Sequence, residues 1–217
     1  MADIFVAIDA AAADDTAGDA AAMMRDDPQL ARVHGGTDGV TPVLHAMYQQ
    51  KFALARSLAD AAGALDLAEA AAIGDVVQVR DRLASGVGVD SRTPDGFTPL
   101  HLAAFFGAPT VVAELIGAGA DLDAVAENAM RVQPLHAATA GRHGDCAALL
   151  IDAGADVNGA QRDGYTPLHS AAANGDAALV DRLLAAGAAG EARNDDGQTA
   201  ADLASAAGHQ EVAARLG

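Results

Sequence analysis

A four-residue pattern, Thr-Pro-Leu-His, recurs along this chain and limits what the chain can fold into more than any other feature. It begins at Thr98 and Thr166, and variants of it begin at Gln133 and Thr199. The steps between these four starts are 35, 33 and 33 residues. Self-similarity at such a period predicts a stack of small units, each of which buries its apolar face only against its neighbours.

The stretch Asp163–Gly187 shows how one unit should fold. Its Asp-Gly start predicts a tight turn, Thr166 suits a helix N-cap, and Pro167 suits the first helical position. Apolar residues at helical spacing then predict two short helices, closed by Gly175 and Gly187. Helices shorter than about 12 residues are marginal alone in water, so the units must pack on one another.

These motifs resemble the ankyrin repeat, whose signature T-P-L-H-x-A is matched residue for residue by Thr98–Ala103 and Thr166–Ala171. The segment Gly154–Asn158 is similar to the hairpin of that family. The resemblance implies an all-α fold, an ankyrin-repeat solenoid of helix-turn-helix units with short β-hairpin fingers. It also implies that the motif histidine bonds the motif threonine and the backbone of the neighbouring finger. The histidines concerned are His45, His101, His136 and His169.

We expect one domain over residues 1–217, made of seven repeats. Their predicted bounds are 3–36, 37–64, 65–93, 94–126, 127–160, 161–194 and 195–217, the first a degenerate cap and the last a C-terminal cap. In the second repeat, one extra residue is expected before the leucine of Thr41–His45. In the fifth, Gly141 or Gly144 is expected to close the first helix, because Arg142 stands in the usual place of the glycine.

The third repeat departs from the pattern, because most of its finger is missing between Gly63 and Asp66. Leu67 takes the position of the motif leucine and Ala68 that of the motif histidine. We therefore predict a tight helix-to-helix connection at this point.

Composition limits the class of protein. Apolar residues make up 51% of the chain, yet no apolar run approaches the roughly 18 residues of a membrane span. The N-terminus lacks the basic flank of a secretory signal, and the one cysteine, Cys146, excludes an internal disulfide. We expect a cytoplasmic monomer.

The net charge of −17 comes from 30 acidic residues against 13 lysines and arginines. Such a surface repels phosphate backbones and anionic lipid heads, so we expect neither nucleic acid nor a membrane as a partner. A GC-rich genome or adaptation to high salt would explain the acidity as background. A surface made for a basic partner is the alternative.

No residue pattern indicates catalysis. Equivalent histidines on adjacent packed helices lie about 8–10 Å apart, whereas zinc ligands lie about 2 Å from one ion. Cys146 lies beside Asp145 at a helical position that is expected to face the core. Burial and a neighbouring carboxylate both disfavour a reactive thiolate. We expect no catalytic residue, no metal, no cofactor and no enzymatic activity.

Phe97, Phe105 and Phe106 are three of only seven aromatic residues, and all three lie in the fourth repeat. The resemblance implies that fingertips and the exposed ends of first helices contact partners, so we predict an apolar, aromatic strip with a charged rim. Its members are Arg92, Asp95, Phe97, Phe105, Phe106, Val125, Glu127, Met130, Arg131, Val132 and Tyr165. Alternatively, one or two of the phenylalanines fill the gap left by the missing finger.

The sequence thus predicts a non-catalytic protein-protein interaction module whose partner, of unknown identity, has a basic surface. Three alternatives stay open. The chain is an acidic inhibitor or immunity-type protein that masks a basic site, a module whose partner is encoded nearby, or an enzyme on a repeat scaffold.

Overall fold

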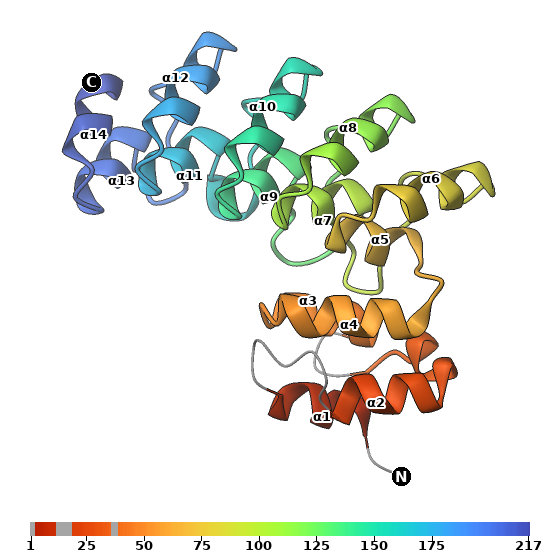
Figure 1. Ribbon diagram of the computed structural model, residues 1–217. Coiled ribbons are helices and arrows are strands. Elements are labelled where there is room, and N and C mark those ends of the chain that lie inside the picture. Colours follow the sequence, from red (N-terminus) through yellow and green to blue (C-terminus); the bar gives the residue numbers. More distant parts are fainter. Residues whose placement is uncertain (1–2, 12–18, 36–38) are drawn as a thin grey trace. The chain divides into compact units, whose positions relative to one another are not determined.

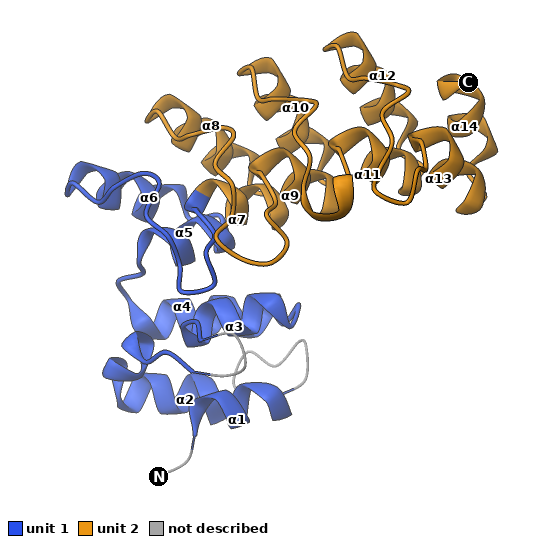
Figure 2. Cartoon of the chain, turned by 180° about the vertical axis from the view of Figure 1, so that it is seen from behind, with its two compact units in different colours: residues 1–99 blue, residues 100–217 orange. Residues whose placement is uncertain are grey.

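The computed structural model describes residues 3–11, 19–35 and 39–217. The chain divides into two compact units, residues 1–99 and residues 100–217, shown in two colours in Figure 2. Each unit is described by itself below. In both units the regular structure of the described residues is almost entirely helical.

Unit 1 contains short helices that pair along the chain, at the red-to-yellow end of Figure 1. They are α1 (Ile4–Ala10), α2 (Asp19–Asp26), the 3-10 helix η1 (Pro28–Arg32), α3 (Pro42–Tyr48), α4 (Phe52–Ala62), α5 (Leu67–Ile73) and α6 (Val76–Ala84). Helices α1 and α2 pack on α3 and α4, and α5 packs on both α3 and α4. The predicted boundary between the first two repeats, at residues 36 and 37, lies outside the described residues.

The core of unit 1 is built from the apolar stripes of these helices. Ile8, Met24, Leu54 and Leu58 are fully buried between α1, α2 and α4. Burying a side chain of this size stabilises the fold by about 1.5–3 kcal/mol. The N-terminal segment, predicted to be a degenerate repeat, therefore contributes two helices and several buried apolar side chains.

Unit 2 contains four helix pairs in sequence order (Figure 1). Its helices are α7 (Pro99–Phe105, whose first residue ends unit 1), α8 (Pro109–Gly117), α9 (Pro134–Ala140), α10 (Gly144–Asp152), α11 (Pro167–Ala173), α12 (Ala177–Ala185), α13 (Ala200–Ala206) and α14 (Gln210–Leu216), with a 3-10 turn η2 at Arg162–Gly164. The first helices α9, α11 and α13 pack on one another, and so do the second helices α8, α10, α12 and α14. This is the stacked architecture that the repeat period predicted.

The first helices of most repeats begin and end as the sequence predicts, with exceptions at the closing residue. Proline stands at the first turn of α3, α9 and α11, where its missing N–H costs nothing. Gly107 and Gly175 adopt positive φ after the helix, as the closing position requires. In the fifth repeat the expectation of a displaced glycine was wrong. Arg142 itself adopts φ 61°, and Gln50 does the same in the second repeat with φ 59°.

The prediction of an extra residue in the second repeat is also wrong, as the spacing from the motif threonine to the closing residue shows. Nine residues separate Thr41 from Gln50, as nine separate Thr98 from Gly107, so no extra residue is present. Val43 therefore takes the leucine position, and Leu44 takes the position of the motif histidine. Both side chains are buried.

The predicted tight connection before the third repeat is confirmed. Helix α4 ends at Ala62 and α5 begins at Leu67. Asp66 caps α5, and a capping box with Glu69 replaces the usual Thr-Pro start. Leu67 and Ala68 keep the leucine and histidine positions predicted for them, counted from the closing Gly74.

The fingers between the helix pairs contain no β-strands in the part of the chain that the structure describes, so β-hairpin fingers are not shown. Backbone hydrogen bonds close the fingers, for example from the amide of Gln161 to the carbonyl of Tyr165 at 2.9 Å. Adjacent fingers are joined in turn. The amide of Arg162 donates to Met130, and that of Asp195 donates to Asp163, both at 3.0 Å.

Candidate binding surface

The motif histidines of unit 2 connect each first helix to the next finger. Nε2 of His101, His136 and His169 lies 3.0, 3.3 and 3.1 Å from the carbonyl oxygens of Val132, Tyr165 and Gln198. All three rings are buried. The bond to the neighbouring finger implied for these three side chains is confirmed, and the bond to the motif threonine is seen at His169, whose Nδ1 lies 2.8 Å from Oγ1 of Thr166.

The hydrogen bonds also indicate the tautomer that a neutral ring adopts at two of these positions. Nδ1 accepts from the backbone amide of Gln133 in His136 and from that of Thr166 in His169. The proton of a neutral ring must then be on Nε2, which donates to the carbonyl oxygen. Burial lowers the pKa of His136, which favours this neutral form.

His45 is an exception among the four motif histidines. It lies one residue beyond the motif position, and its Nε2 is 2.8 Å from Oδ1 of Asp9 on α1. The ring of Phe5 packs on it edge to face, with 5.4 Å between the ring centroids. His45 therefore connects α3 to α1.

Cys146 is fully buried in α10, and its Sγ lies 4.0 Å from the carbonyl oxygen of Ala103. Burial raises the pKa of the thiol to about 11, and the neighbouring Asp145 carboxylate adds to the effect. The thiol is therefore protonated and unreactive at neutral pH. No group of three or more metal-binding side chains occurs among the residues that the structure describes.

Phe105 and Phe106 end the first helix of unit 2. Their rings meet edge to face, with centroids 5.0 Å apart and an interplanar angle of 81°. Phe105 is 41% exposed, whereas Phe106 is half-buried. Phe105 thus presents an apolar side chain to solvent at the position predicted for partner contact.

The finger between α8 and α9 presents further apolar side chains. Val125 is 37% exposed and Met130 56% exposed, and Glu127 and Arg131 are exposed beside them in the sequence. Val132 is only 8% exposed, and its carbonyl oxygen is held by the amide of Ala126 and by His101. Its side chain therefore contributes little to any exposed surface.

Tyr165 occupies the corresponding place in the next finger and is half-buried. Its ring lies 5.8 Å from the ring of His169, centroid to centroid. Its carbonyl oxygen receives the hydrogen bond from His136.

The remaining predicted members belong to unit 1. Arg92 donates from Nη1 to the carbonyl oxygen of Gly96 at 3.0 Å, and Asp95 accepts from the hydroxyl of Tyr48 at 2.7 Å. Phe97 is half-buried, and its backbone amide and carbonyl oxygen both bond the Thr93 side chain. Arg92 and Asp95 thus have partners within their own unit.

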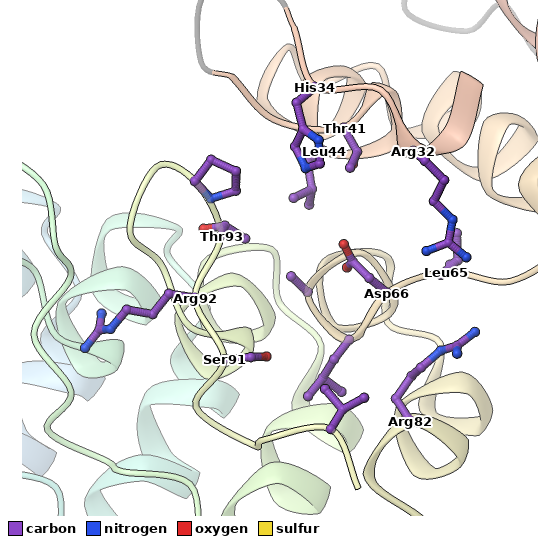
Figure 3. Close-up of a pocket in the computed structure, with 14 residues that line it drawn as sticks. Arg32, His34, Thr41, Leu44, Leu65, Asp66, Arg82, Ser91, Arg92 and Thr93 are labelled. Carbon is purple, nitrogen blue, oxygen red and sulfur yellow. The ribbon is translucent and has the colours of Figure 1, made fainter. Parts of the chain in front are cut away.

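Sequence reasoning missed a cavity in unit 1, shown in Figure 3. It has a volume of about 540 Å³ and lies between the start of α3 on one side and α5, α6 and the following finger on the other. Arg32, Arg82, Thr41 and Leu44 are among its lining residues. None of the three phenylalanines lines it. The only signal in the sequence was the missing finger before Asp66.

Comparison with protein families decides the classification. A model described as ankyrin repeats (3 copies) matches residues 67–161, and one described as ankyrin repeats (many copies) matches residues 131–204. Together the two matches span most of the chain. The chain belongs to the ankyrin repeat family. Ankyrin repeats indicate a protein-protein interaction module, and proteins of this kind are generally non-catalytic.

A curated relative is similar over part of this ankyrin repeat protein. Protein fem-1 homolog A of Danio rerio is 48% identical over 62 residues, which is 28% of this chain and 10% of the relative. The chain therefore spans a small part of that relative's length. Within the described residues, no helix is long and apolar enough to cross a membrane.

Proposed function

We propose that this ankyrin repeat protein is a non-catalytic module that holds a partner protein against the finger and first-helix side of unit 2. The observation that carries the proposal is the exposure of three large apolar side chains in this region, Phe105, Val125 and Met130. Exposed apolar side chains with charged neighbours are a usual feature of interaction sites, and aromatic side chains are frequent anchors.

The side chains of this region indicate the chemical character of the partner surface. Phe105 and Met130 gain most from burial against apolar side chains, whereas Glu127 and Arg131 suit polar partners at the edge of a contact. The net charge of −17 favours a partner whose surface is basic around an apolar centre. Tyr165, half-buried in the next finger, would extend the contact along the stack.

The acidity of the chain favours a second candidate function, an inhibitor that masks a basic site on its partner. The two candidates differ in their response to salt. A complex held mainly by charge weakens steeply as salt is added, because exposed charges are screened over about 8 Å at physiological ionic strength. A complex anchored by Phe105 and Met130 keeps most of its affinity.

The experiment is capture of a partner by the full chain from the cytosol of its source, followed by measurement of the affinity at low and high salt. Retention at high salt favours the apolar contact. Loss of the complex as salt rises favours the masking inhibitor. If the chain captures no protein at either salt concentration, the proposed function is wrong.

A further inference from the structure

The cavity of unit 1 exists because two motif elements are absent from the same place. Leu44 stands at the motif position from which a histidine elsewhere binds the next finger, and that finger is missing before Asp66. Ala68, at the next histidine position, adds only a methyl group to the wall. The space that a finger and a histidine ring would fill is left open within the unit.

The lining of this cavity is basic although the chain as a whole is acidic. Three arginines and one aspartate are among its lining residues, Arg32, Arg82, Arg92 and Asp66, and His34 lies beside them. In Figure 3, Arg32 and Arg82 extend toward each other from opposite walls, near Leu65 and Asp66. Arg92 points away, toward its bond with Gly96.

One of the two converging guanidinium groups, that of Arg82, has a buried nitrogen without a partner among the described residues, whereas Arg32 is exposed. Neither Arg32 nor Arg82 has a side-chain hydrogen bond or an ion pair with any residue that the structure describes, and Nε of Arg82 is buried. By contrast, Arg182 and Arg215 each pair with a carboxylate. An unsatisfied buried donor destabilises the fold, and a bound acceptor would remove that cost.

A buried threonine borders the same space. Thr41 is 5% exposed and lines the cavity, and its hydroxyl interacts with the buried carboxyl of Glu69. Leu44, Leu65 and Val87 supply apolar wall beside these polar groups. A cavity of this size, with apolar walls and a few converging polar groups, is typical of a ligand site.

We propose that this cavity binds an anionic group, a carboxylate or a phosphate, carried on a short aliphatic body. Arg32 and Arg82 hold the anion, since guanidinium groups match the oxygens of both anions with paired N–H donors. Leu44, Leu65 and Val87 contact the aliphatic part. The site is separate from the partner surface proposed for unit 2.

The test uses the full chain labelled with ¹⁵N and three probes that share a six-carbon body: hexanoate, hexyl phosphate and neutral hexanol. Each probe is titrated while the Nε–H signals of the arginines and the amide signals are followed by NMR. We expect saturable shifts at Arg82 and Thr41 with at least one anionic probe. The probe that binds more tightly identifies the head group as carboxylate or phosphate.

Variants locate the site. Arg32→Gln and Arg82→Gln should each weaken binding about tenfold, the change expected for losing about 1.4 kcal/mol. Arg131→Gln, which removes an exposed arginine of unit 2, should leave the affinity unchanged. Arg32 is exposed, so Arg32→Gln still tests the proposal if Arg82→Gln does not fold. Failure of both anions to bind, equal binding of hexanol, or an equal effect of Arg131→Gln would each overturn the proposal.

Discussion

Asp66 and Glu69 each accept a hydrogen bond from the backbone amide of the other, at 2.8 Å to Oε2 of Glu69 and 2.7 Å to Oδ1 of Asp66. This reciprocal pair starts α5 in place of the Thr-Pro start. It buries Glu69, which is 3% exposed. Burial, and then the charge of Asp66, raise the pKa of Glu69 to about 7, although Thr41 and Arg32 oppose the rise.

The raised pKa of Glu69 predicts that stability depends on pH. Between pH 4.5 and about 7 the folded chain keeps a proton on Glu69 that the unfolded chain releases. The free energy of unfolding should therefore fall by about 3 kcal/mol as pH rises through this window and level off above it. Urea denaturation over this range, wild type against Glu69→Gln, isolates this contribution from that of the other carboxylates. Curves that stay parallel for the two proteins would contradict the assignment.

His169→Ala should destabilise unit 2. The change removes the bond to the carbonyl oxygen of Gln198 and leaves the buried amide of Thr166 without its acceptor. We expect a loss of about 2–3 kcal/mol, measured by chemical denaturation. Ser205→Ala, at an exposed position of the same unit, is the control and should change little. An unchanged stability of His169→Ala would rule out the structural role of the ring.

Gln50→Gly should stabilise unit 1. Gln50 is exposed and adopts φ 59°, a conformation that costs a residue with a side chain about 1–2 kcal/mol and glycine almost nothing. After the entropy cost of glycine, a gain of about 0.5–1 kcal/mol remains. Gly208→Ala is the converse, because Gly208 has φ 85° and open space around it, and it should lose a similar amount. A loss of stability in Gln50→Gly, seen by thermal denaturation, would refute this reasoning.

The thiol of Cys146 should resist alkylation in the native chain. It is fully buried, and its pKa of about 11 keeps it protonated at neutral pH. Iodoacetamide labelling, followed by mass spectrometry, should be slow in buffer and fast in denaturant. Rapid labelling of the folded chain would mean that α10 opens readily or that the thiol is exposed.

Several features were predictable from the sequence because local rules determine them. Proline at the first turn and glycine after the last turn place α9, α11 and their neighbours. The burial of Cys146 followed from its helical position. The roles of His101 and His169 followed from the family resemblance, because several motifs match the ankyrin repeat at the same relative positions.

Other features depend on tertiary context. Gln50 and Arg142 hold a left-handed backbone that their side chains disfavour, because the helix pairs on either side fix the chain there. The sequence places Val132 at a fingertip, yet its side chain is buried. The basic cavity was not predictable, since its arginines are far apart in sequence and meet only because a finger is absent.

The measurement that tests the central claim most directly is partner capture by two matched triple variants. Phe105→Ser, Val125→Ser and Met130→Ser remove the exposed apolar side chains of unit 2. The control variant carries Val6→Ser, Phe52→Ser and Val77→Ser, which remove three exposed side chains of unit 1. Each of these is more exposed than Phe105 and Val125, and only Phe52 is less exposed than Met130. Both variants should remain folded, which circular dichroism and thermal denaturation can show. We expect the unit 1 variant to capture the same partner as the wild type and the unit 2 variant to lose it. Equal capture by the unit 2 variant would contradict the proposed surface.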